Sequence, residues 1–289
     1  MGLYSCSHPL DYSWVKSLDL QYTRYSRSLH PPLFGIKKRE GCVVSYAKTS
    51  ATKEVEIAPL PGRSQETLEE AIEDFQQGMG RFPSSRFALE SLTLPHYPKE
   101  EIPFSFLLTG SVETMRDDAR LSTTTYMKVK IGHFSWKEAV FCLKTLKSLF
   151  PEKHWALDGN RGWTFEEFSA FTRSFDPSDF LYIEEPVSSL LALRRVAQTT
   201  PFRLALDESL YETSAKELLG FPSISTLVVK PTLYGGLTDL IALQKHARDK
   251  EIVLSSSVES KVGLKNIEKL RQALQLKTPL GVGTNRFFF

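Results

Sequence analysis

The sequence is poor in cysteine, which limits both its chemistry and its expected compartment. Only Cys6, Cys42 and Cys142 occur among 289 residues, and they stand far apart. An odd number at such separations gives neither a disulfide framework nor the paired spacing of a zinc site. We therefore expect a protein of the reducing cytoplasm.

The sequence also lacks long hydrophobic runs and a surplus of charge. No apolar stretch reaches the roughly 20 residues that a membrane helix requires. The opening MGLYSCSHPL shows no basic segment followed by an apolar one, so we expect no signal peptide. With 36 Lys and Arg against 34 Asp and Glu, the net charge is +2. This balance gives no reason to expect a nucleic acid or an acidic membrane as a partner, and it favours no particular oligomeric state.

The pattern of apolar residues changes near residue 100 and predicts two parts. Before it, GCVVSYAKT and KEVEIAPL have the pattern of two strands of a meander, and two helices follow, the first with Ser64 as its expected N-cap. After residue 100, short apolar strands alternate with amphipathic helices, which predicts right-handed crossovers and a parallel sheet.

The second part should contain seven strands, with a short eighth near PLGVGTN. This number fits a (β/α) barrel better than an open doubly wound sheet. The open sheet lacks support because no GxGxxG fingerprint follows the first strand. The expected fold class is therefore α/β, with an α+β part over residues 1–100 and a barrel over residues 101–289.

Charged residues recur at the ends of consecutive predicted strands, at separations of 28, 26, 23 and 23 residues. One acidic residue at a strand end is most often a helix cap or a loop residue. Five charges in register favour a common site, because the carboxyl ends of barrel strands meet at one mouth, where active sites of this fold lie. The five residues are Lys130, Asp158, Glu184, Asp207 and Lys230.

The three acidic residues of this set predict a divalent cation. Asp158, Glu184 and Asp207 would repel one another strongly unless a cation compensated them. Three carboxylates without a nearby His or Cys are hard oxygen ligands, which suit Mg²⁺ or Mn²⁺ and not Zn²⁺. Asn160, in the segment LDGNRGW, is a candidate hydrogen-bond donor to these ligands.

The lysines predict proton transfer. Lys128 and Lys130 are two residues apart on one strand, so both side chains point to the same face, while Lys230 comes from the opposite side of the mouth. Two neighbouring ammonium groups, partly desolvated, are expected to lower each other's pKa and so provide a base at neutral pH. The chemistry that fits is removal of a proton α to a carboxylate on a small molecule, with a cation stabilising the product charge.

Six segments in this order resemble the enolase superfamily, in its muconate-lactonizing subgroup, and within it the o-succinylbenzoate synthases. Members of this superfamily use a Lys or His base together with Mg²⁺. The resemblance implies a modified TIM barrel with an N-terminal α+β capping domain that closes over the mouth and is joined by the C-terminal tail. From the resemblance, the segment 17–41 is expected to contain a mobile loop. The segments are MKVKIG, ALDGNRGW, LYIEEPV, LALDESL, VVKPTLYGG and LSSSVES.

The resemblance also implies a role for each candidate residue. Asp158, Glu184 and Asp207 fall on the metal ligands. Lys130 falls on the base that removes the α-proton and returns a proton to the departing hydroxyl, and Lys230 on the cation that stabilises the enediolate. Three further residues bind substrate: Lys128 lies near its carboxylate, and Ser255 and Ser257 meet the succinyl carboxylate.

The reaction that the resemblance implies is the dehydration of 2-succinyl-6-hydroxy-2,4-cyclohexadiene-1-carboxylate to o-succinylbenzoate, in menaquinone biosynthesis. The alternative is a dipeptide or N-acylamino acid epimerase on the same scaffold. Many epimerising relatives carry an Asp two residues beyond the second lysine, where this chain has Thr232, so the sequence favours the lyase. A non-catalytic scaffold is a third hypothesis, and the retention of all six charges argues against it.

Overall fold

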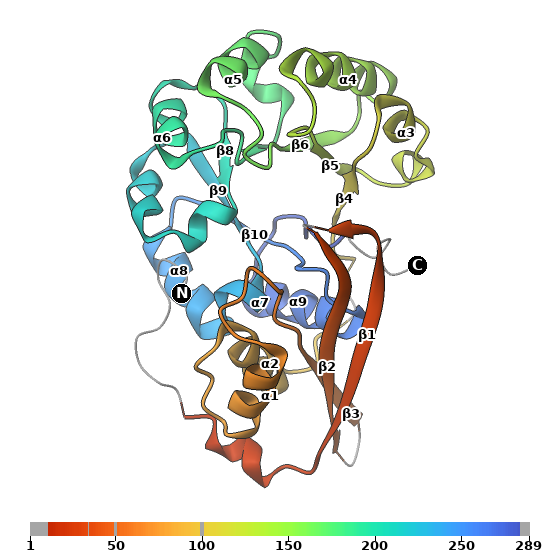
Figure 1. Ribbon diagram of the computed structural model, residues 1–289, viewed down its shortest axis with the longest axis vertical. Helices are drawn as coiled ribbons and strands as arrows, with labels where there is room; N and C mark the ends of the chain where they lie inside the picture. Colours follow the sequence, from red (N-terminus) through yellow and green to blue (C-terminus); the bar gives the residue numbers. More distant parts are fainter. Residues whose placement is uncertain (1–10, 34, 49–50, 99–100, 284–289) are drawn as a thin grey trace.

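We examined a computed structural model, which describes residues 11–33, 35–48, 51–98 and 101–283 (Figure 1). A three-stranded antiparallel sheet and two helices form the N-terminal part, and a curled sheet of seven parallel strands with helices around it forms the rest. No helix in the described ranges is long and apolar enough to cross a lipid bilayer.

The antiparallel sheet has the order β1-β2-β3, with strands at Leu20–Leu33, Ile36–Lys48 and Ala51–Ile57. The two expected strands are β2 and β3. The expectation of a mobile loop over residues 17–41 was wrong, because β1 and the start of β2 occupy this segment. Leu20 and Tyr22 pack against the apolar cluster beneath the sheet, and this alternate burial stabilises a strand whose other face is polar.

Two helices cover the antiparallel sheet, α1 at Leu68–Gln76 and α2 at Pro83–Thr93. The N-cap of α1 is Thr67, which forms a capping box with Glu70, and not Ser64 as expected. The Ser64 hydroxyl instead accepts a hydrogen bond from the Leu60 amide at 2.8 Å. An apolar cluster that includes Val44, Val55, Ile57 and Phe75 fills the space between sheet and helices.

The parallel sheet has the order β10-β9-β8-β7-β6-β5-β4. Its strands are β4 at Ser105–Leu108, β5 at Tyr126–Lys130, β6 at His154–Asp158, β7 at Ile183–Glu184, β8 at Leu204–Leu206, β9 at Ile224–Val229 and β10 at Glu251–Leu254. The ring is closed by Leu280 and Gly281, which form parallel bridges to Phe104 and Ser255. The expected short eighth strand therefore occupies the gap between β4 and β10.

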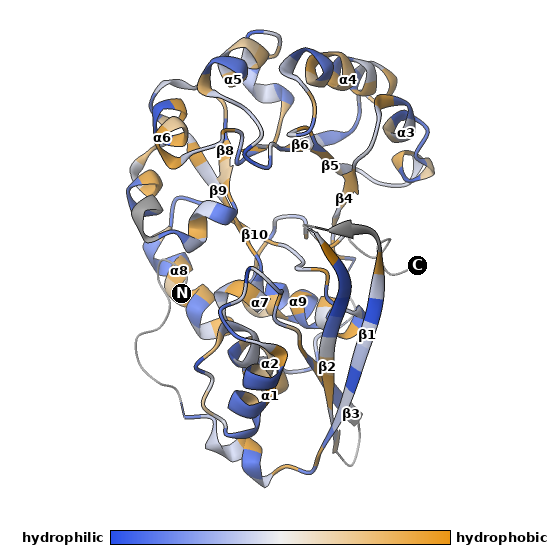
Figure 2. Cartoon of the chain, viewed as in Figure 1, coloured by the Kyte–Doolittle hydropathy of each residue, from blue (hydrophilic) through white to orange (hydrophobic). Residues whose placement is uncertain are grey.

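Helices alternate with these strands along the chain. The longer ones are α4 at Trp136–Leu149, α5 at Phe165–Thr172, α6 at Leu190–Thr199, α8 at Leu237–His246 and α9 at Lys261–Ala273. Shorter segments are η1 at Ser13–Ser17, α3 at Val112–Arg116, η2 at Ala119–Ser122, η3 at Pro177–Asp179, η4 at Glu208–Tyr211, η5 at Thr213–Gly220 and α7 at Pro231–Tyr234. Figure 2 shows orange and blue residues alternating around the outer helices, as expected of helices with one buried face.

The interior of the ring is arranged in layers, and this arrangement positions the site. Five buried residues, four from strands and Tyr182 from the position directly before β7, form one small apolar cluster: Ala156, Tyr182, Ala205, Val228 and Val253. Because side chains alternate along a strand, the residue two positions later on each strand points into the ring one layer nearer the mouth. Those residues are Asp158, Glu184, Asp207, Lys230 and Ser255.

Three side chains join the N-terminal part to the barrel. Glu56, at the end of β3, accepts hydrogen bonds from the amides of Ser260 and Gly263 at the start of α9. Arg86 of α2 pairs with Asp239 of α8 at 2.8 Å. The expected joining of the C-terminal tail to the N-terminal part falls on residues 284–289, which lie outside the described ranges.

Candidate active site

The two lysines of β5 point into the ring, and their neighbours point outward. Lys128 lies level with Ala156 of β6, and Lys130 lies level with Asp158 at the end of that strand. The intervening Met127 and Val129 are fully buried in the cluster between the sheet and its helices. Lys128 therefore lies deeper in the barrel and Lys130 nearer the mouth.

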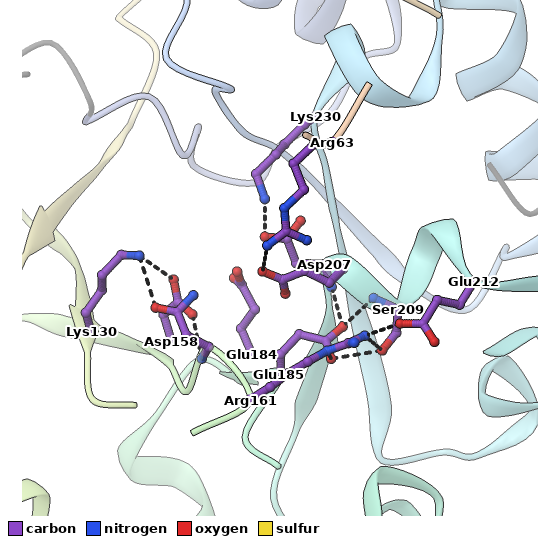
Figure 3. Close-up of polar contacts among 12 residues, drawn as sticks. Arg63, Lys130, Asp158, Arg161, Glu184, Glu185, Asp207, Ser209, Glu212 and Lys230 are labelled. Carbon is purple, nitrogen blue, oxygen red and sulfur yellow. Dashed lines mark hydrogen bonds and ion pairs between the residues drawn. The ribbon is translucent and has the colours of Figure 1, made fainter. Parts of the chain in front are cut away.

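The three acidic residues come together at the same end of the ring. Asp158 and Glu184 end β6 and β7, and Asp207 directly follows β8. They are only 4%, 1% and 4% exposed, so each must be compensated by a partner. Lysines supply these partners in the structure (Figure 3).

Each lysine lies beside at least one carboxylate, and Lys128 and Lys130 share Asp158. The Lys128 Nζ lies 3.3 Å from Asp158 Oδ2 and 2.6 Å from Glu184 Oε2, and the Lys230 Nζ pairs with Asp207 Oδ2. Lys130 Nζ lies 3.9 Å from Asp158 Oδ2 and donates to Asn160 Oδ1 at 3.0 Å. Asn160 in turn donates its main-chain amide to Asp158 Oδ1 at 3.1 Å. The five charges predicted from the strand ends thus lie together with Lys128 at one end of the ring.

The carboxylates control the pKa of the deeper lysine. Burial acts to lower the pKa of the Lys128 ammonium, but the charges of Asp158 and Glu184 outweigh burial and hold this pKa well above its ordinary value. The pKa of Lys230 is raised in the same way, with Asp207 as the main opposing charge. The expectation that neighbouring ammonium groups lower each other's pKa was wrong for Lys128, because two carboxylates lie closer to it than they were expected to.

The carboxylate cluster fits a divalent cation in its chemistry. It presents three hard oxygen ligands from adjacent strands, and Asp207 Oδ1 is buried without a hydrogen-bond partner among the described residues. The side chains do not converge on one point as they stand, since the described ranges contain no group of three acidic, His or Cys residues already spaced to hold an ion. The ammonium groups lie between the carboxylates, so a cation would bind by taking over the charge compensation that Lys128 and Lys230 now provide.

A cavity opens above the cluster. Its wall includes all three lysines, Asp158, Asp207, Asn160 and Ser255, and the sequence reasoning did not foresee its other residues. These are Ser105, Leu107, Ser256, Val258, Gly281 and Gly283. Ser105 and Leu107 come from β4, Ser256 and Val258 from the segment after β10, and the two glycines from the closing segment. These short segments carry little periodic signal.

The two serines proposed to bind substrate differ in their surroundings. Ser255 lines the cavity and donates its hydroxyl to Gly281 O at 3.0 Å, so it also ties the closing segment to β10. Ser257 is 2% exposed and lies outside the lining of this cavity. Its amide donates to Glu259 Oε2 at 2.6 Å. The structure thus brings Ser255 to the cavity, whereas Ser257 is buried and does not line it.

Three glycines let the turns beyond β5 and β6 lie close to their neighbours. A Cβ at Gly132 would lie 2.6 Å from the carbonyl carbon of Gly159, and one at Gly159 would lie 2.6 Å from the Cα of Pro186. A Cβ at Gly162 would lie 2.8 Å from the carbonyl carbon of Gly132. Because only glycine permits such approach, these residues fix the spacing of the strand ends that carry the cluster.

The N-terminal part reaches the site through Arg63. Its guanidinium lies 4.0 Å from Glu208, the residue after Asp207 (Figure 3). Arg63 belongs to the turn PLPGRSQ between β3 and α1, from which the sequence analysis carried over no site residue. The turn therefore lies at the rim of the mouth.

The chain is similar in sequence to known proteins. The model of the family "Enolase C-terminal domain-like" matches residues 111–273. The o-succinylbenzoate synthase of Yersinia enterocolitica is 30% identical over 272 residues, covering 86% of this chain and 83% of that protein. The o-succinylbenzoate synthase of Pasteurella multocida is 27% identical, with 86% and 82% covered.

Solved structures agree with the sequence relatives. The o-succinylbenzoate synthase of Thermosynechococcus elongatus, complexed with Mg in its active site, superposes with a TM-score of 0.77 and 25% identity over 93% of this chain and 94% of that one. The L-Ala-D/L-Glu epimerase of Bacillus subtilis superposes with a TM-score of 0.74 at 17% identity, over 94% and 90% of the two chains. The second likeness concerns the fold alone.

Proposed function

The chain belongs to the o-succinylbenzoate synthase family of the enolase superfamily, and from this premise we propose that it is a carbon–oxygen lyase. Its substrate in this proposal is 2-succinyl-6-hydroxy-2,4-cyclohexadiene-1-carboxylate, which loses water to give o-succinylbenzoate in menaquinone biosynthesis. The observation that carries the proposal is the layer of three carboxylates and three lysines at one end of the ring.

We propose that Asp158, Glu184 and Asp207 hold Mg²⁺, for which Mn²⁺ can substitute. A bound divalent cation supplies positive charge that stabilises a carboxylate carrying extra negative charge. Residues 1–100 form the capping domain in this proposal, and the position of Arg63 at the rim supports that assignment.

The three lysines have different roles in this proposal. Lys130, at the top of β5, accepts the proton of the carbon α to the carboxylate. The same ammonium then donates a proton to the departing hydroxyl, so that one C–H and one C–O bond break, a ring double bond forms and water leaves. Lys230 approaches from the far side of the ring and stabilises the intermediate negative charge as a cation. Lys128 lies beneath them, beside Asp158 and Glu184.

Lysines on opposite sides of the mouth would also suit a 1,1-proton transfer, as in an epimerase. The surroundings of Thr232 favour the lyase. Thr232 is 2% exposed and its hydroxyl donates to Glu259 Oε1 at 2.7 Å, so this position presents no carboxylate to a substrate amine.

A direct assay tests this function. The purified protein is incubated with the cyclohexadiene carboxylate and, separately, with a panel of dipeptides, each with Mg²⁺ and with EDTA. We expect formation of o-succinylbenzoate that EDTA abolishes and excess Mg²⁺ restores. Epimerised dipeptides without dehydration would establish the alternative, and dehydration that is unaffected by EDTA would contradict the metal requirement.

A further inference from the structure

Glu185 is a further buried carboxylate next to the three of the cluster, and it points away from the lysines. It directly follows Glu184, so the alternation of side chains places it on the other side of the strand end. It is 0% exposed, and its φ is +39°, in the left-handed region, immediately before Pro186. Both features are unfavourable for glutamate, and a residue keeps them only where its surroundings impose them.

The Glu185 carboxylate accepts hydrogen bonds from the turn that carries Asp207. Its Oε1 accepts from the main-chain amides of Asp207 at 2.9 Å and Ser209 at 2.8 Å. Its Oε2 accepts from the Ser209 hydroxyl at 2.8 Å. A single side chain therefore fixes the first three residues beyond β8, the second of which is Glu208.

Arg161 completes this network from the turn that follows β6. Its Nε lies 3.2 Å from Glu185 Oε2, and its Nη2 donates to the Ser209 hydroxyl at 2.8 Å and to Glu212 at 2.6 Å (Figure 3). Its main-chain amide donates to Glu185 O at 2.7 Å, and its φ is +58°. Asp158, three residues before Arg161, and Asp207 are thereby connected through Glu185 as well as through the sheet.

We propose that Glu185, held by Arg161, is a positioning residue that sets the main chain of Asp207 and with it the affinity of the site for a divalent cation. Glu185 acts through Asp207 and touches neither cation nor substrate. The inference rests on the proposed function only in assuming that Asp158, Glu184 and Asp207 bind the cation. Partners of metal ligands contribute about 10–100-fold to metal affinity, which sets the size of the expected effect.

The test measures Mn²⁺ binding by electron paramagnetic resonance, in the full-length protein without substrate. Glu185→Gln keeps the size of the side chain but places an amide where two donors, Arg161 and Ser209, now meet a carboxylate. We expect it to weaken Mn²⁺ binding about 10–100-fold. Asp207→Asn should weaken binding further, because it alters a ligand itself. The control is Glu166→Gln, whose carboxylate is 73% exposed and 3.4 Å from Arg195, and it should bind Mn²⁺ like the wild type.

Activity then separates positioning from general damage. If Glu185 acts through the cation, kcat of Glu185→Gln should return to near the wild-type value when Mg²⁺ is raised well above its weakened Kd. The melting temperature of the metal-free protein shows whether the variant folds. If it does not, Arg161→Met is decisive, since it leaves the bonds from Glu185 to Asp207 in place and should give a smaller loss of affinity in the same direction.

The outcomes are distinct. Unchanged Mn²⁺ affinity in folded Glu185→Gln and Arg161→Met overturns the inference, as does lost activity that no concentration of Mg²⁺ restores. Failure of the wild type to bind Mn²⁺ at all would instead refute the metal site of the proposed function.

Discussion

At the scale of single residues, Lys130 is the group whose chemistry can be tested most directly. Its ammonium lies nearer the mouth than that of Lys128, 3.0 Å from Asn160 Oδ1. In Lys130→Arg the guanidinium stays protonated at any working pH, so it cannot accept a proton even though its charge is retained. We expect kcat to fall about 10²–10⁴-fold or more, because the group acts as base and then as acid.

The control for Lys130 is Lys144→Arg, which makes the same exchange at an exposed position of α4 and should leave kcat unchanged. Solvent deuterium exchange at the α-carbon, followed by NMR alongside turnover, measures the proton transfer itself. Dehydration by Lys130→Arg at near the wild-type rate would show that Lys130 only binds a carboxylate.

The sequence could identify four of the charged residues because each lies two positions after an apolar residue of the inner layer, at or just beyond the end of a strand: Asp158, Glu184, Asp207 and Lys230. Alternation also separates Glu184 from Glu185, once Tyr182 is known to point inward. It could not separate Ser255 from Ser257, since β10 ends at Leu254 and the period of two no longer holds beyond it. Nor could it show that carboxylates would surround Lys128, which depends on distances between strands.

At the scale of elements, the alternation of strands and helices was sufficient to predict the barrel and its short closing strand. It was not sufficient for β1, whose polar face and register with β2 follow from pairing. The close approach of the turns at Gly132, Gly159 and Gly162 could not be predicted from the sequence either, because glycine occurs in loops for many reasons.

The close approach of these turns predicts a large difference between two glycine substitutions. In Gly132→Ala the new methyl group would overlap main-chain atoms of Gly159, which cannot move without displacing β6. We expect the free energy of unfolding to fall by about 1–3 kcal/mol or more, as in overpacked cores. The matched control is Gly220→Ala, where nothing lies within 4 Å of the new Cβ. It should be neutral or stabilise by up to about 1 kcal/mol.

Urea unfolding followed by fluorescence measures both glycine variants. Equal stability of Gly132→Ala and the wild type would mean that the turns beyond β5 and β6 can separate. In that case Gly132 does not fix the spacing of the strand ends.

At the scale of the whole molecule, buried polar contacts join the apolar core of the N-terminal part to that of the barrel. One of these contacts reaches a residue that lines the cavity. Arg39 of β2 is fully buried and donates to the carbonyls of Pro59 at 2.7 Å and Val258 at 3.2 Å. Val258 lines the cavity with φ at +64°, which is strained for a β-branched residue. It also packs against Leu29 of β1. The N-terminal part therefore helps to hold one wall of the cavity in its unfavourable conformation.

These contacts of Arg39 predict that Arg39→Met will affect substrate binding more than the chemical step. The substitution leaves buried carbonyls without donors, each of which costs about 1–3 kcal/mol. Since no reacting group contacts Arg39, we expect KM to rise several-fold while kcat changes little, with faster amide hydrogen exchange over residues 255–260. Arg24→Met is the control, because Arg24 pairs with Glu69 on the surface with 58% and 66% of the side chains exposed. Such a pair contributes only about 0–1 kcal/mol, so KM and exchange should match the wild type. An Arg39→Met variant with unchanged KM and unchanged exchange would show that the barrel holds Val258 without help from β2.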